Sequence, residues 1–379
     1  MSRSRSSLLP RVVLLNAVSF EARIKAHEAF TIGRPGGARG DLRYAVARGM
    51  RCDRRRLADA DFTGADLTGS TFVGSDMARV SLYCANLTRC DLRGASLFRA
   101  DLRGGTYSGA KLAGANLDQA DMRAAVLCIA DDTLGLKWIG PRTSMAGATA
   151  NGADMSDAVA LGVDFTNCSM RGALLRNANL KNANFTDANL DGVDLSGARL
   201  SGVQLQGAIL TNVDTALLER SGVRLTGCVL DPDAQAIARL GEIRAVLDRS
   251  ELWIKTNGRD GAPACLDGFD LRPAASLLAR QLLAGMSARA AQAIGVDFSG
   301  AQLQGAIFDD ADLRGANFKG ADLRGASFLR ARLAHAVFEG ADLSALETQG
   351  GGSRGARFEG ADLTGTGMVH KPARELELI

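Results

Sequence analysis

The chain has 379 residues, of which 46% are apolar but only 5% aromatic, and its 45 Lys and Arg against 42 Asp and Glu give a net charge of +3. This apolar content excludes a disordered chain, and 7 prolines beside 44 glycines without a G-X-Y period exclude collagen. With so few aromatic side chains, the interior is expected to be narrow and lined by Ala and Leu. The balanced charge argues against direct nucleic-acid binding, and no apolar run is long enough for a membrane span.

The seven cysteines are scattered, with no CxxC pair and no zinc-ligand spacing. We therefore expect no disulfide framework, no metal site and no cofactor. Scattered thiols are typical of a reduced compartment, so we expect a cytoplasmic protein. The apolar run at residues 12–15 is too short for a signal peptide.

In chain order, residues 1–30 form an N-terminal segment with a capping helix predicted over 19–30. A Gly33-Arg34-Pro35-Gly36 turn then leads into a repeat array assigned to residues 31–230. The residue two positions before a large one is mostly small, and Asp or Asn often lies between them. Large apolar residues recur at every fifth position: Leu57, Phe62, Leu67, Phe72, Met77, Leu82, Leu87, Leu92, Leu97, Leu102, Tyr107, Leu112, Leu117, Met122 and Leu127.

A five-residue period fits neither a helix, which would spread the large residues around its circumference, nor a strand, which would alternate them between two faces. The chain must therefore turn a corner within each unit. We expect the large and the small position to point inward and the other three outward, with successive turns stacked through backbone hydrogen bonds.

These A-(D/N)-L-x-x units resemble the pentapeptide-repeat family. The resemblance implies an all-β solenoid, a right-handed quadrilateral β-helix with four units per turn and short capping and junction helices. Positions four units apart would then stack. Phe298, Phe318, Phe338 and Phe358 would form one column, with Phe308 and Phe328 opposite, provided that the glycine-rich loop near Gly351 does not shift the phase.

Three segments interrupt the repeat. An insert is predicted at 131–144, where the offset between the registers is not a multiple of five, so the segment must bulge out or restart the coil. A helical junction with a second lead-in module is predicted at 231–292, with Asp231 as the N-cap of its first helix and a further helix starting at Pro273. A second pentapeptide-repeat β-helix follows at 293–370, and residues 371–379 form a tail.

No catalytic residues are predicted, because His27, His335 and His370 lie far apart in the sequence and the Asp residues recur at one repeat position as a turn ladder. We expect His335 to point into solvent, and Cys90, Cys168 and Cys228 to fill small inward positions. Lys137, Trp138 and Arg142 in the insert are the candidate partner-binding residues. The alternative to partner binding is that the insert folds back and covers the edge of a coil.

The leading hypothesis is a non-catalytic scaffold that binds another macromolecule, with a protein as partner. The resemblance also implies an alternative, a DNA mimic that binds DNA gyrase, which needs an acidic face. Arginines two residues after the outward Asp argue against such a face. An enzyme with a site at the insert or junction is a further alternative, and a homodimer through the helices or through Leu376, Leu378 and Ile379 stays open.

Overall fold

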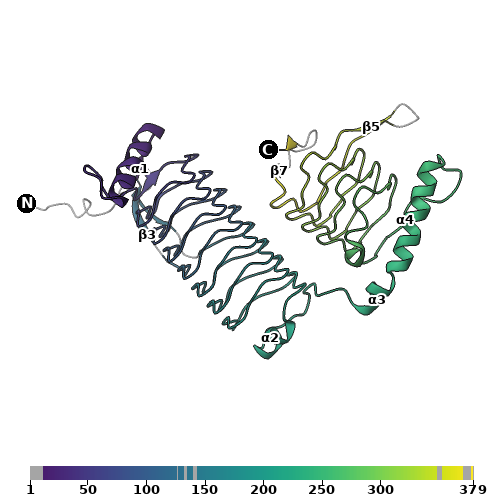
Figure 1. The fold of residues 1–379 in the computed structure, drawn as a ribbon, viewed down its shortest axis with the longest axis horizontal. Helices are drawn as coiled ribbons and strands as arrows, with labels where there is room; N and C mark the ends of the chain where they lie inside the picture. The colour runs from purple at the N-terminus through teal and green to yellow at the C-terminus, as the bar shows by residue number, and fades with distance from the viewer. Residues whose placement is uncertain are drawn as a thin grey trace, which may run out of the picture. The chain divides into compact units, whose positions relative to one another are not determined.

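The computed structural model describes residues 12–125, 127–131, 135–139, 143–347, 352–369 and 377–378. The chain divides into two compact units, Met1–Leu230 and Asp231–Ile379. Each unit contains a stack of backbone coils (Figure 1). None of the helices in the described part of the chain is both long and apolar enough to cross a membrane.

The first unit is a solenoid whose turns each hold four pentapeptides. Parallel β-bridges pair Asp41 with Asp61 and Val46 with Asp66, and the same spacing continues along the unit. Backbone N–H groups donate along the stack, as from Leu42 to the carbonyl of Asp61 at 2.7 Å. We call a set of pentapeptides that stack in successive turns a column, named by its large residue in the first turn: Leu42, Ala47, Cys52 or Leu57.

The large and the small position of each unit both point into the bore. Leu92, Leu97 and Leu102 are completely buried, and so are small residues such as Ala60 and Cys90. The corner residue has a left-handed backbone: in the Leu42 column φ is 66° at Gly64 and 55° at Cys84. Glycine adopts this conformation without strain, which explains its frequency two residues after the large position.

A helix covers the first turn of the first unit. Strand β1 (Val13–Leu14) pairs in parallel with β2 (Ala45–Val46), and α1 (Ala17–Thr31) follows, capped by the side chain of Asn16. Phe20 and Ile24 of α1 are buried in the same core cluster as the bore residues. The predicted helix is confirmed, with slightly wider bounds.

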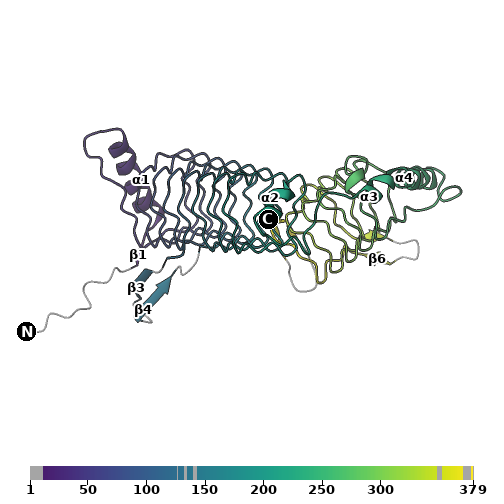
Figure 2. The ribbon, with the colours of Figure 1, turned by 90° about the horizontal axis from the view of Figure 1, so that it is seen from below.

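The insert is an antiparallel hairpin, and the solenoid continues across it. Strands β3 (Leu127–Asp131) and β4 (Gly135–Ile139) pair with each other and project from the array (Figure 2). Thr106 bridges Ser144 where the regular spacing would place residue 126, so the hairpin lengthens one turn without breaking the stack. The prediction that Leu127 fills the next bore position is wrong, because Met145 is the large residue of that unit.

The first unit ends irregularly. Helix α2 (Thr215–Arg220) replaces two pentapeptides at the positions where the sequence period is weakest. Asp214 caps this helix by accepting a hydrogen bond from the N–H of Leu217 at 3.1 Å. The last bridge of the unit pairs Ile209 with Val229.

The second unit also starts with helices, α3 (Ala234–Ala238) and α4 (Leu240–Lys255). The N-cap of α3 is Asp233, which accepts from Ala236 N–H at 2.8 Å, and not Asp231 as predicted. Ile243 and Leu247 of α4 are buried against the first turn of this unit.

The predicted helix from Pro273 is wrong. Only a short 3-10 helix, η2 (Arg272–Ala274), forms there, and the coils begin near Cys265, within the segment to residue 292 that was assigned to the junction. Leu278 and Leu283 occupy successive large positions and are completely buried, so they are bore residues. Cys265 bridges Ser287 where the regular spacing would place residue 285, and this small insertion shifts the period.

The bore of the second unit contains two stacked columns of phenylalanine. Adjacent rings within a column lie nearly parallel, with Phe298 and Phe318 centroids 5.1 Å apart, and rings of different columns meet edge to face. Phe358 stacks on Phe328 at 4.9 Å and not on Phe338, so the predicted column is wrong at this residue. Ser327 bridges Arg357 where the regular spacing would place residue 347, because the hairpin of β5 (Leu346–Glu347) and β6 (Ser353–Arg354) shifts the phase by half a turn. Strands β7 (Met368–Val369) and β8 (Glu377–Leu378) pair at the end of this unit.

Candidate interaction surfaces

The outward Asp positions of the solenoid bind its own backbone and its own arginines. The Asp91 carboxylate accepts from the backbone N–H and the guanidinium of Arg93, and the closest charged contact is 2.6 Å. In the Leu42 column, the side-chain hydrogen bond from Arg43 lowers the pKa of Asp41. The same Asp-x-Arg contact recurs at Asp101–Arg103, Asp121–Arg123, Asp270–Arg272, Asp312–Arg314 and Asp322–Arg324.

Arginines also reach Asp residues in neighbouring turns. Arg79 contacts Asp59 at 2.6 Å and Arg330 contacts Asp310 at 2.6 Å, and each pair joins equivalent positions of two successive turns. The predicted turn ladder of Asp residues is confirmed. At these positions arginines neutralise the outward Asp residues, whereas a DNA mimic needs a continuous acidic face.

Among the described residues, no group of three His, Cys, Asp or Glu side chains is placed to hold a metal ion. Cys90 and Cys168 are completely buried as predicted, whereas Cys228 is partly exposed. Burial raises the pKa of Cys52 and of Cys90 to about 12, so these thiols stay protonated and unreactive. His335 lies at a corner, two residues after the large residue Leu333, with φ 59° and a partly exposed side chain.

Two ion pairs attach α1 to the first turn. Arg55 contacts Glu21 at 3.0 Å and Glu28 at 2.8 Å, and Glu28 also accepts from the backbone N–H of Arg56. The hydrogen bond from Arg55 lowers the pKa of Glu28. Between these contacts, the Nδ1 atom of the completely buried His27 accepts from the N–H of Gly40 at 2.9 Å. The sequence did not single out His27 because its partner is a backbone group.

This buried histidine makes the attachment of α1 depend on pH. Burial lowers the pKa of His27 below its ordinary value, with Asp59 and Arg39 as the nearest charges. Since the folded pKa lies below the unfolded one, the stabilisation is complete above about pH 6.5 and is lost as the pH falls through the folded pKa. We expect amide exchange of residues 17–31, corrected for intrinsic rates, to accelerate over this range. In a His27→Gln variant, whose amide oxygen can still accept from Gly40, the corrected exchange rates should not change with pH over this range. Equal acceleration in both proteins would contradict the role of His27.

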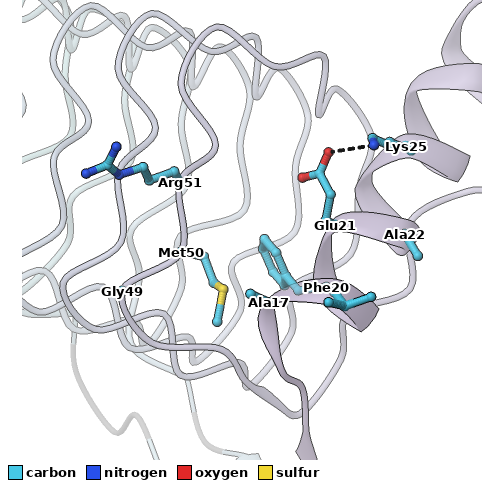
Figure 3. Close-up of a pocket in the computed structure, with 9 residues that line it drawn as sticks. Ala17, Phe20, Glu21, Ala22, Lys25, Gly49, Met50 and Arg51 are labelled. Atoms are coloured by element: carbon cyan, nitrogen blue, oxygen red, sulfur yellow. Dashed lines mark ion pairs between the residues drawn. The ribbon is translucent and has the colours of Figure 1, made fainter.

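A pocket of about 680 Å³ lies between α1 and the corner of the first turn (Figure 3). Apolar side chains and the charged residues Glu21, Lys25 and Arg51 line it, and the Arg51 side chain points away from α1. The ring of Phe20 lies between α1 and the segment that carries Met50. The lining residues are Ala17, Val18, Phe20, Glu21, Ala22, Lys25, Gly49, Met50 and Arg51. The pocket was not predicted from the sequence, because it arises only when α1 docks.

The candidate partner-binding residues belong to the hairpin. The backbone of Lys137 pairs with Ile129 and that of Trp138 with Cys128. Arg142 and the side chains of Lys137 and Trp138 lie outside the described residues. Their role therefore stays a prediction.

The model for pentapeptide repeats matches the sequence in eight copies, over residues 56–94, 90–128, 142–177, 178–214 and 311–345. The chain belongs to the pentapeptide-repeat family. No curated protein matches the sequence.

Several solved structures resemble this pentapeptide-repeat protein at low identity. HetL, a pentapeptide repeat protein involved in heterocyst differentiation regulation in the cyanobacterium Nostoc sp., is 19% identical; the match covers 90% of this chain and 100% of HetL, with a TM-score of 0.29. QnrB1, a plasmid-mediated fluoroquinolone resistance protein, is 21% identical, with 57% of this chain and 99% of QnrB1 covered and a TM-score of 0.31. A pentapeptide repeat protein of the Arabidopsis thaliana thylakoid lumen is 24% identical, with 34% and 71% covered and a TM-score of 0.15.

Proposed function

We propose that this pentapeptide-repeat protein is a non-catalytic scaffold that binds another protein in the cytoplasm. We infer four-sided β-helices in which α1 and α4 cap the starting ends, so that the bore is shielded from water and part of the ladder edge is covered. Such a solenoid holds side chains and inserted loops at fixed positions along a rigid axis.

The observation that carries this proposal is the bridge between Thr106 and Ser144. The coil closes across the β3–β4 hairpin, so the backbone bridge between Thr106 and Ser144 does not depend on the added segment. An element that a rigid scaffold carries without structural need is a good candidate for partner binding.

The test is a capture experiment with a deletion of residues 125–142, which restores the regular spacing between Thr106 and Ser144. We expect the deletion variant to keep the circular dichroism spectrum of the array and to lose cross-linked partners in the native cell. The triple variant Lys137→Ala, Trp138→Ala, Arg142→Ala should lose the same partners, whereas Lys181→Ala on the array should retain them. Unchanged capture by both hairpin variants would contradict a role for the hairpin.

The DNA mimic that binds gyrase is the weaker alternative, because arginines neutralise the acidic positions that it would use. A supercoiling assay with purified gyrase separates the two hypotheses. We expect no change in supercoiling on addition of the protein; inhibition or protection at equimolar protein would favour the mimic.

A further inference from the structure

The first turn of the solenoid is shielded unevenly. In the Leu42 column, the carbonyl of Asp41 accepts from the Arg23 side chain at 2.7 Å and Gly40 donates to His27. The Ala47 column is covered by β1, whose Val13 and Leu15 N–H groups donate to the carbonyls of Tyr44 and Val46. In the Leu57 column, Arg56 N–H donates to Glu28 at 3.2 Å.

The Cys52 column is the exception. Arg51 bridges Thr71 in the second turn on one side. On its other side, the N–H and C=O of Arg51 make no hydrogen bond within the described residues, and Arg51 is one of the residues that line the pocket beside α1. A free strand edge next to an apolar pocket is the geometry by which proteins bind an extended peptide, since the edge supplies the backbone hydrogen bonds and the pocket accepts alternate side chains.

The positive charge around the pocket at the start of the first unit favours an acidic binding partner. The segment 12–60 contains ten Lys and Arg but five Asp and Glu, although the whole chain is nearly neutral. Arg51 at the edge of the pocket has no ion pair in the described part of the chain, and Lys25 is largely exposed with a single contact of 3.7 Å to Glu21. Glu21 is itself held by Arg55 at 3.0 Å. The pocket is therefore lined by apolar side chains together with two basic residues and Glu21, whose charge is paired with Arg55.

Two occupants from the protein itself fit poorly. The segment 1–11 contains three arginines and no acidic residue, so the basic edge repels it. A second copy that docked through the same end would bring an equally basic surface against this one.

We propose that the pocket and the edge at Arg51 form a docking site for an extended segment of a partner protein that alternates acidic and apolar residues. The segment adds one short parallel strand to the first turn, as β1 does in the neighbouring column. Its apolar side chain enters the pocket against Phe20 and Met50, and its acidic side chains lie near Lys25 and Arg51. This inference rests on the proposed scaffold function and names the chemistry of its partner.

The test is selection of random octapeptides displayed on phage against the full-length protein. We expect enrichment of sequences that alternate acidic and apolar residues, and synthetic copies should bind in fluorescence anisotropy. Arg51→Pro removes the edge N–H, which has no partner in the described solenoid, so the array should stay folded while affinity falls at least about tenfold. Lys25→Ala should weaken binding in a salt-dependent manner. Lys111→Ala, a matched cation in the same column three turns on, should have no effect.

Other outcomes overturn the proposal. Enriched peptides that are basic or that ignore Arg51→Pro would contradict it, as would an absence of enrichment. Binding of phosphatidylserine vesicles or of duplex DNA through Lys25 and Arg51, without peptide binding, would assign the basic end to a different macromolecule. If the selection fails while deletion of residues 125–142 still abolishes capture, this docking site is wrong but the scaffold function stands.

Discussion

Gly105→Ala should destabilise the first unit by about 1–3 kcal/mol, although alanine is the usual residue at this repeat position. Gly105 precedes Tyr107, whose ring fills the bore where most units have leucine or phenylalanine. A Cβ at Gly105 would lie 2.7 Å from Cε2 and 2.8 Å from the hydroxyl of Tyr107. That hydroxyl is buried without a hydrogen-bond partner among the described residues, and the whole Tyr107 side chain is completely buried.

The double variant Gly105→Ala, Tyr107→Leu supplies the control. It recreates the ordinary A-x-L unit, so it should be more stable than Gly105→Ala alone, and the two substitutions should couple strongly. Ala85 occupies the same position one turn earlier beside Leu87, and Ala85→Gly should have only a small effect. Denaturant unfolding of these variants, of Tyr107→Leu and of the unmodified protein measures the coupling; additive effects would mean that the ring does not occupy the bore.

Phe318→Ala should have the largest effect in the second unit, about 3–5 kcal/mol. The ring is completely buried. It stacks on Phe298 at 5.1 Å and on Phe338 at 5.2 Å, and it meets Phe308 and Phe328 edge to face. Its removal opens a cavity where both columns meet, and rigid neighbouring turns cannot collapse into it.

Phe318→Leu is the matched variant, because leucine fills the equivalent position in other units, and we expect a loss below about 1.5 kcal/mol. Hydrogen exchange resolved by peptide localises the effect to one unit. Faster exchange should appear in peptides from residues 265–347 and not in residues 61–125. Equal losses for the alanine and the leucine variant would contradict the stacked arrangement.

The period in the sequence was sufficient to predict the bore, because each unit repeats the same pair of inward residues. The predictions were wrong where a short insertion changes the spacing between stacked residues while the five-residue pattern continues on either side. The small insertion between Cys265 and Ser287 made Leu278 and Leu283 resemble one face of a helix. The added hairpin at β5 and β6 moved Phe358 to the other column.

The candidate docking site could not be predicted from the five-residue period. Its pocket combines one face of α1 with an uncovered edge of the first turn, and which edge stays free depends on contacts such as that of Gly40 with His27. These contacts are set by how the helix packs. Only the basic composition of the segment 12–60 was visible in the sequence.

Disulfide trapping tests the turn of four pentapeptides most directly. Parallel bridge partners bring Cα atoms within the range that a disulfide can span. Mild oxidation should cross-link Ser96→Cys with Asn116→Cys, which are bridge partners, and Thr106→Cys with Ser144→Cys across the hairpin. Ser96→Cys with Thr106→Cys, half a turn apart, should not form a bond. Peptide mapping that found the half-turn pair linked, and the two bridge pairs free, would contradict the solenoid.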